Sequence, residues 1–145
     1  MTSQVIDTSA LVKYVLPEED SPIVENLVAF HRAGLANLMA PAYVLVESAN
    51  VLWKHVQRSS VRPDDAVPAL RALRDLGIRL VPDADLLEDA LILAVDNGIT
   101  VYDALFCALA ARESIQLITA DSALFRRLTG TDIQATMLSE WSGSG

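Results

Sequence analysis

Residues 100–121 read TVYDALFCALAARESIQLITAD, and this stretch carries the clearest structural signal of the chain. Its first part, Val101–Glu113, is largely apolar and predicts a buried helix, and Gln116–Thr119 then predicts a strand. A second helical pattern, Ser122–Leu128, follows the strand after a short turn. Helices and strands in such close alternation are typical of a fold in which the strands run parallel.

The same alternation extends over the rest of the chain. Further strands are predicted at Gln4–Ile6, Leu38–Ala40, Ile78–Val81 and Ala135–Leu138, and further helices at Ser9–Leu16, Ser21–Ala33, Pro41–Arg58, Pro63–Leu76 and Asp85–Asp96. Ser21 is expected to be an N-cap, and Gly77 and Gly98 to end helices. We therefore expect an α/β protein with one three-layer α/β/α domain over residues 1–141 and a central parallel sheet of four to five short strands. The last residues, SGSG (142–145), are expected to be flexible or a cloning remnant.

The composition narrows the kind of protein and the kind of metal site. Of the 145 residues, 52% are hydrophobic, which excludes a chain that is disordered throughout. The single cysteine, Cys107, rules out an internal disulfide and a cysteine-rich zinc site, and His31 and His55 lack the spacing of metal ligands. Any bound metal must therefore be held by oxygen ligands. No apolar run reaches the ~20 residues of a membrane span, and we expect a soluble cytoplasmic protein with no membrane partner.

The charge balance argues against non-specific binding of nucleic acid. The chain has 11 basic and 19 acidic residues and a formal net charge of −8, whereas a phosphate backbone is bound by Lys and Arg side chains that displace its counterions. The balance favours a basic partner or a divalent cation. Residues 80–111 contain six acids and no Lys or Arg, and residues 54–79 contain six bases, although each segment is also compatible with a solvated helix face.

Two aspartates stand at predicted strand-to-helix turns. Asp7 follows the apolar pair Val5 and Ile6, and Asp121 follows the strand Gln116–Thr119. Both are expected at the carboxyl edge of the sheet, where open α/β folds bind their ligands. Each is also a favoured N-cap residue that accepts backbone N–H bonds, so both interpretations stay open.

Two further acids lie on predicted helices. Asp103 shares a face with apolar residues, and a carboxylate there is costly to bury unless its charge is compensated. Its alternative role is in a capping box with Thr100. Glu47, on the helix Pro41–Arg58, is also compatible with an ordinary solvated glutamate. Several carboxylates drawn together repel one another unless a cation or a shared proton compensates, and Mg²⁺ or Mn²⁺ prefers such oxygen ligands. A cation would also allow an acidic protein to act on RNA.

Four short motifs in this order resemble the PIN domain family. They are VIDTSA at residues 5–10, Glu47 on its helix, TVYDA at residues 100–104 and LITAD at residues 117–121. Within that family, the chain is most similar to the VapC toxins of type II toxin–antitoxin modules, over residues 1 to about 141. The resemblance implies an endoribonuclease that depends on Mg²⁺, or on Mn²⁺ as a substitute, and hydrolyses RNA phosphodiester bonds.

The resemblance also implies roles for individual residues. Asp7, Glu47, Asp103 and Asp121 match the acidic quartet of the family. Asp7 and Asp103 would be the principal metal ligands, Asp121 would contribute directly or through water, and Glu47 would orient or deprotonate the attacking water. Small hydroxyl residues would help to hold the carboxylates; these are Thr8, Ser9 and Thr119.

The resemblance further implies a homodimer that is inhibited by a cognate antitoxin protein. An antitoxin arginine directed at the acidic site would suit its charge. Candidate contacts to the RNA substrate are the bases of residues 54–79 and the pair Arg126 and Arg127, although a solvated side chain is the favoured interpretation of each.

Other classes of function were weighed against the nuclease. A haloacid-dehalogenase-type phosphatase needs a second acid where this chain has Ser9, and a receiver domain needs a late strand-end lysine, whereas the only lysines are Lys13 and Lys54. A PIN-type RNA-processing nuclease and a non-catalytic PIN-like binding module remain as alternatives. Processing nucleases often carry an added zinc module, which a single cysteine cannot form.

Overall fold

The core of the fold is a five-stranded parallel sheet, seen in a computed structural model that describes residues 2–143. Its strands are β1 (Thr2–Ile6), β2 (Ala36–Pro41), β3 (Arg79–Val81), β4 (Gln116–Thr119) and β5 (Ala135–Met137), in the spatial order β3-β2-β1-β4-β5. The central strand β1 pairs with β2 on one side and β4 on the other, so that Val5 lies opposite Met39 and Leu117. The expected parallel sheet is confirmed.

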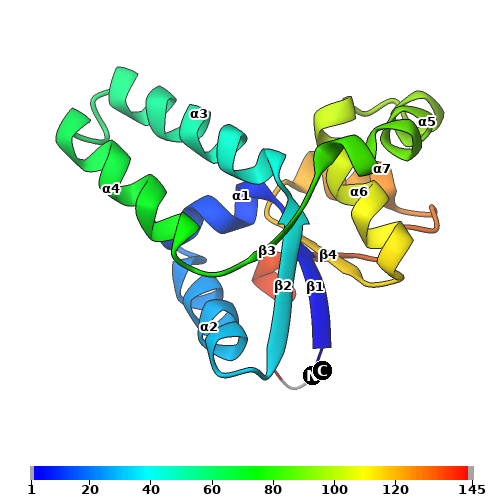
Figure 1. The fold of residues 1–145 in the computed structure, drawn as a ribbon, viewed down its shortest axis with the longest axis horizontal. Helices are drawn as coiled ribbons and strands as arrows, with labels where there is room; N and C mark the ends of the chain where they lie inside the picture. Colours follow the sequence, from blue (N-terminus) through cyan, green and yellow to red (C-terminus); the bar gives the residue numbers. More distant parts are fainter. Residues whose placement is uncertain (1, 144–145) are drawn as a thin grey trace.

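Helices cover both faces of the sheet (Figure 1). One face carries α1 (Thr8–Leu11), the 3₁₀ helix η1 (Val12–Tyr14), α2 (Ser21–Arg32), α3 (Tyr43–Gln57) and α4 (Pro63–Arg74). The other carries α5 (Leu87–Asn97), α6 (Val101–Glu113) and α7 (Ser122–Leu128), and two more 3₁₀ turns are η2 (Asp83–Asp85) and η3 (Leu138–Glu140). This is the expected three-layer α/β/α arrangement. No single helix within residues 2–143 is long and apolar enough to cross a membrane, and α5 and α6 qualify only as a pair bent by 112°.

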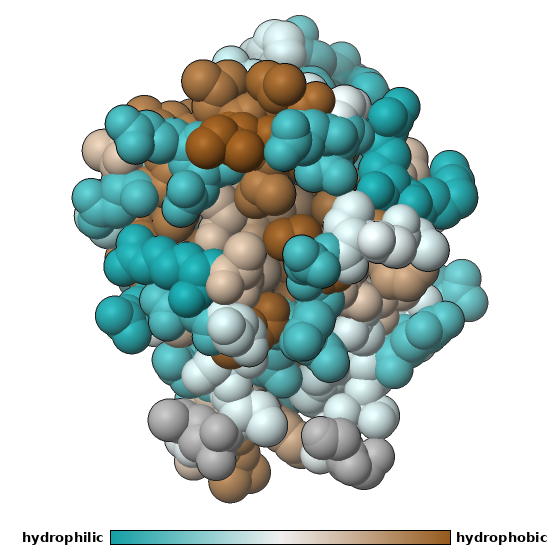
Figure 2. All heavy atoms as spheres, turned by 90° about the vertical axis from the view of Figure 1, so that its right-hand side faces the viewer, coloured by the Kyte–Doolittle hydropathy of each residue, from teal (hydrophilic) through white to brown (hydrophobic). Residues whose placement is uncertain are grey.

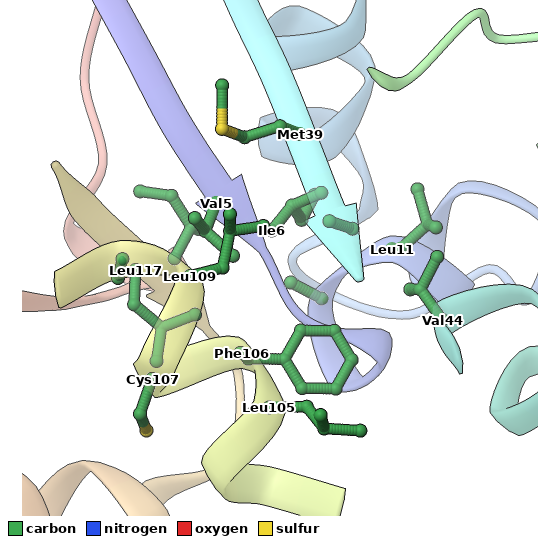
Figure 3. Close-up of a cluster of buried hydrophobic side chains, with 14 of the residues drawn as sticks. Val5, Ile6, Leu11, Met39, Val44, Leu105, Phe106, Cys107, Leu109 and Leu117 are labelled. Atoms are coloured by element: carbon green, nitrogen blue, oxygen red, sulfur yellow. The ribbon is translucent and has the colours of Figure 1, made fainter. Parts of the chain in front are cut away.

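The helix α6 fills the centre of one face of the sheet. All of its residues from 104 to 110 are buried, because the segment is apolar on every side and has no face suited to solvent. Phe106 and Leu109 belong to the same buried cluster as Val5, Ile6 and Leu117 of the two central strands (Figure 3). Burial of α6 brings Asp103, in the first turn of this helix, to the edge of the sheet.

The strand order reverses between β1 and β4. The chain runs from β1 outward to β2 and β3, and then returns past β1 to form β4 and β5 on the other side. In open parallel sheets, the crevice at the carboxyl ends of the strands that flank such a reversal is the usual place for a ligand. Asp7 directly follows β1, and Asp121 follows β4 by two residues.

Some predicted boundaries are wrong, and hydrogen bonds explain why. Ser21 is not the N-cap of α2, because its hydroxyl accepts from Glu18 N–H and donates to the Lys13 carbonyl, at 2.8 Å each. Pro41 belongs to β2 and not to α3, since the N–H of the next residue, Ala42, bonds to β3 at 2.8 Å and continues the pairing of the strands.

Two predicted helices are shorter than expected. The segment 9–16 forms α1 and then the tighter turn η1, and the segment 85–96 begins with the turn η2 before α5 starts at Leu87. Gly98 is the C-cap of α5 and has positive φ, as predicted. The helix α4 instead ends at Arg74 with Asp75 as its C-cap, and Gly77 adopts positive φ two residues further on. Of the predicted flexible tail, residues 144–145 lie outside the described residues.

Candidate active site

Asp7 is a buried carboxylate at the end of the central strand. Only 5% of the residue is exposed, and its Oδ1 accepts hydrogen bonds from Ser9 Oγ at 2.7 Å and from the N–H of Ala10 at 3.1 Å. Burial raises the pKa of Asp7 from 3.8 to about 6, because removal from water disfavours the charged form. The negative charge of Asp103 adds to this rise, while the hydrogen bonds from Thr119, Ser9 and Ala10 oppose it.

A small hydroxyl network joins the ends of β1 and β4. Ser9 Oγ lies 3.3 Å from Thr119 Oγ1 and accepts from the N–H of Ala120 at 2.9 Å. Thr119 Oγ1 in turn accepts from the N–H of Asp121 at 3.0 Å. Ser9 and Thr119 therefore fix the two strand ends relative to each other.

Thr8 does not join this network. Its hydroxyl is buried and makes no hydrogen bond within residues 2–143, so it does not hold a carboxylate in the way that the resemblance implies. Ser9 and the backbone of Ala10 take up the Asp7 carboxylate instead.

Asp121 caps the helix that follows it. Its Oδ1 accepts from the N–H groups of Ala123 at 3.0 Å and Leu124 at 3.1 Å, at the start of α7. Asp7 likewise caps α1 through Ala10. The capping interpretation is therefore correct for both residues, but it involves one oxygen of Asp121 and leaves Oδ2 without a hydrogen bond to residues 2–143. Capping and ligand binding are compatible here.

Asp103 is half-buried in the first turn of α6. Its N–H donates to Thr100 Oγ1 at 3.1 Å, so Thr100 is the N-cap of this helix. Burial raises the pKa of Asp103, and the charges of Glu47 and Asp121 raise it further, while a hydrogen bond from Thr100 lowers it. Asp103 thus lies within electrostatic range of Glu47 and Asp121, as well as of Asp7.

Glu47 comes from the opposite side of the sheet, on α3, and its side chain is partly buried. Its charge raises the pKa of Asp103 on α6, which shows that the two helices bring these carboxylates near each other. The four acids named from the sequence are thus linked through Asp103. None of them forms an ion pair with Lys, Arg or His within residues 2–143, whereas the partly buried Asp20 has Lys13 at 3.5 Å.

The donor set suits a hard divalent cation. All of the groups are carboxylate oxygens, and burial raises the pKa of the neighbouring Cys107 to about 12, so its thiol supplies no thiolate ligand. Within residues 2–143, no three His, Cys, Asp or Glu side chains are close enough to form a ready-made metal cluster. Mg²⁺ does not require one, because it binds through one or two carboxylates together with waters and substrate phosphate oxygens.

Three residues beside the acids were not singled out from the sequence. The rings of Tyr43 and Tyr102 stack with their centroids 5.2 Å apart and their planes at 18°. Asp83 Oδ1 accepts from the N–H of Tyr43 at 3.0 Å and so ties the start of α3 to the segment after β3. Asp83 could have been noticed in the sequence as a third acid close behind a predicted strand. The stack of Tyr43 on Tyr102 could not, because residues so far apart in the chain leave no local sequence pattern.

Residues 5–130 match the model of the PIN domain. The chain belongs to the PIN domain family. Ribonuclease VapC3 from Pyrobaculum aerophilum is 38% identical over 122 residues, which are 83% of this chain and 90% of that relative. The predicted resemblance to the VapC proteins of the PIN domain family is confirmed.

Solved structures of VapC proteins share this PIN domain fold. One is VapBC2 from Rickettsia felis bound to a DNA fragment from its promoter, with a TM-score of 0.66 at 15% identity, covering 97% of this chain and 99% of that one. Another is VapC20 from Mycobacterium tuberculosis, described as a sarcin–ricin loop cleaving toxin, with a TM-score of 0.63 at 20% identity, covering 90% and 98%. At these identities, the likeness shows the fold.

Proposed function

We propose that this PIN domain is a Mg²⁺- or Mn²⁺-dependent endoribonuclease that hydrolyses RNA phosphodiester bonds and acts as the toxin of a toxin–antitoxin pair. One observation carries the proposal: four buried or partly buried carboxylates are linked electrostatically through Asp103 and lack a cationic partner within residues 2–143. Such a cluster is costly in free energy unless a cation joins it. The relative VapC3 is named a ribonuclease, which supports the same reading.

The four acids have different proposed roles in metal binding and hydrolysis. Asp7 and Asp103 would be the principal ligands of the cation, with Asp121 contributing directly or through water, and Glu47 would orient or deprotonate the attacking water. When bound, a divalent cation supplies the positive charge that shields the phosphoryl oxygens and lowers the pKa of water. Ser9 holds one oxygen of Asp7 in a fixed position, so that the carboxylate needs no rearrangement to bind.

Basic side chains are candidates for contacts to the rest of the RNA. Arg126 and Arg127 are exposed on α7, the helix capped by Asp121. The bases of residues 54–79 are spread over the exposed ends and faces of α3, α4 and β3. In a protein of net charge −8, these contacts supplement a cation at the acids and do not replace it.

A homodimer and an antitoxin complete the proposal. The outer face of α5 leaves apolar side chains 48–74% exposed, namely Leu87, Leu91, Ile92 and Val95, and Figure 2 shows apolar atoms gathered at the top of this side of the molecule. A second copy would cover them. The similar VapBC-5 from Mycobacterium tuberculosis is described as a member of the VapBC family of toxin–antitoxin systems, which supports an antitoxin partner here. Because the proposed substrate is cellular RNA, we place the activity in the cytoplasm.

The test is cleavage of mixed RNA by purified protein in Mg²⁺, in Mn²⁺ and in EDTA. Wild-type protein should cut RNA in either metal and not in EDTA, and Asp103→Ala should be inactive under all conditions. The matched control is Asp65→Ala, since Asp65 occupies the third position of α4 as Asp103 does in α6, but is exposed. Activity that survives EDTA or Asp103→Ala would contradict the proposal.

The same assay addresses the alternatives. Internal cuts in a circular RNA indicate an endonuclease, and no cleavage of any RNA would favour a non-catalytic binding module. Cleavage that is blocked by the protein encoded next to this gene separates a toxin from a processing enzyme.

A further inference from the structure

Two tyrosines stand beside the acids on the helices that carry Glu47 and Asp103. Tyr43 is the first residue of α3, one turn before Glu47, and Tyr102 directly precedes Asp103 on α6. Their rings are stacked, with centroids 5.2 Å apart and planes at 18°. Burial and the charges of Glu47, Tyr102, Asp103 and Asp83 raise the pKa of Tyr43, so this pair lies in the electrostatic field of the acids.

Tyr102 is the solvent-exposed member of this pair. The residue is 57% exposed although Tyr43 stacks on it. Since Tyr43 covers only one face of the ring, much of the aromatic surface of Tyr102 is open to solvent next to Asp103. Removal of aromatic surface from water is favourable in free energy. The exposed ring of Tyr102 therefore offers a surface on which another flat, apolar ring can stack.

A stack is also the kind of contact that an acidic nuclease site needs. The carboxylates repel the phosphates of a single strand, so a contact that does not depend on charge is useful here. Stacking of a base on an aromatic ring contributes binding energy without any cation, and it tolerates different bases because every base has a π face. A base that stacks on Tyr102 would hold the strand close to Asp103.

We propose that Tyr102, supported by Tyr43, is a positioning residue on which one unpaired base of the RNA stacks beside the scissile phosphate. This inference rests on the proposed ribonuclease function and adds the residue on which a base of the substrate stacks. The alternative is a purely structural role, in which the stack braces α3 against α6 and keeps Glu47 near Asp103.

The experiment compares Tyr102→Leu and Tyr102→Phe with wild-type protein and with a control, Trp53→Leu. Trp53 is exposed to nearly the same extent, 56%, but lies on the second half of α3, beyond Glu47. Cleavage is measured on a single-stranded RNA of about 12 nucleotides that contains a site cut by the wild type. In parallel, the same RNA is made with one base at a time removed to leave an abasic sugar.

A stacking role predicts a rise in KM of about 5- to 150-fold for Tyr102→Leu, with kcat unchanged, and near wild-type kinetics for Tyr102→Phe and Trp53→Leu. Removal of one particular base should raise KM for the wild type and have no further effect on Tyr102→Leu, because the ring and the base act as one contact. A fall in kcat with KM unchanged, or equal abasic penalties for wild type and Tyr102→Leu, would overturn the inference in favour of a structural brace.

A second readout keeps this test separate from the proposed function. If the wild type cuts no RNA, the ribonuclease proposal fails, and stacking is then tested by binding alone. The probe is a random-sequence RNA of about 12 nucleotides with 2-aminopurine at its centre, in Ca²⁺. Quenching of its fluorescence by the wild type and Tyr102→Phe, but not by Tyr102→Leu, supports stacking, and quenching that is equal for all three overturns it.

Discussion

Replacement of Asp7 by Asn should stabilise the metal-free protein at neutral pH and abolish its activity. The Asp7 pKa is 3.8 in a solvated reference and about 6 in the folded protein. A rise of about 2 units corresponds to about 3 kcal/mol at 1.36 kcal/mol per unit, which is the cost of keeping this carboxylate ionised in the fold. Asn carries no charge and keeps an oxygen that accepts from Ser9 and Ala10, so most of this cost should be recovered.

The stability that Asp7→Asn gains over the wild type should increase with pH. Between pH 3.8 and about 6, the folded protein keeps a proton on Asp7 that the unfolded chain has lost, so the free energy of unfolding of the wild type falls as the pH rises through this window. Below the window, Asp7 is protonated in both states and the wild type and Asp7→Asn should be equally stable. Above it, Asp7→Asn should be more stable by up to about 3 kcal/mol, or roughly 10 °C in Tm.

The assay is urea and thermal denaturation in EDTA across this pH range, with Asp65→Asn as an exposed control that should show no such trend. Saturating Mn²⁺ should reduce the difference in stability between Asp7→Asn and the wild type. A cation that binds only the folded wild type adds about 2.7 kcal/mol to its free energy of unfolding at one hundred times its Kd. An Asp7→Asn protein that melts below the wild type at neutral pH, or whose gain is as large at pH 3.8 as at neutral pH, would refute this reasoning.

Three other predictions follow from the same contacts. Asp103→Asn should leave the stability of the metal-free protein unchanged or higher, because it removes a charge that is repelled by Glu47 and Asp121. Metal-dependent cleavage should fall by orders of magnitude, whereas a pure capping role predicts near wild-type cleavage. Ser9→Ala should lower the free energy of unfolding, measured by urea denaturation, by about 1–3 kcal/mol, because the N–H of Ala120 loses its hydrogen-bond partner. An unchanged free energy of unfolding would show that the hydroxyl network of Ser9 and Thr119 does not stabilise the fold. Val95→Asp should convert a dimer to a monomer in light scattering while the circular dichroism spectrum stays that of the folded wild type, and an unchanged dimer would exclude the α5 face.

Much of the fold could be predicted because its signals are local. The helix α6, the strand β4 and the helix α7 have the predicted bounds, since each is delimited by residues that act within one turn, such as Thr100 and Asp121 as N-caps. Ser21 misled the prediction because its hydroxyl bonds back to Lys13, in a loop that is organised by tertiary contacts. Pro41 misled it because pairing with β3, far along the chain, keeps it in a strand.

The candidate site divides in the same way. Asp7, Asp121 and Asp103 could be named from their places behind strands and on an apolar helix. The role of Glu47 came only from the family resemblance, because its link to Asp103 depends on helices from opposite faces of the sheet. The Tyr43–Tyr102 stack arises from that same approach and has no signature within either helix. Thr8 and Ser9 are both small hydroxyl residues next to Asp7, and only the geometry distinguishes the one that bonds to it.

The central claim is that the carboxylates of this PIN domain hold a divalent cation. Anomalous diffraction from a crystal of the wild-type protein soaked in Mn²⁺ tests it most directly, since it locates the metal without relying on activity. We predict a Mn²⁺ peak about 2 Å from carboxylate oxygens of both Asp7 and Asp103, with Asp121 and Glu47 beside it or bridged to it by water. Peaks found only elsewhere on the protein, with Asp7 and Asp103 free of metal at saturating Mn²⁺, would contradict it.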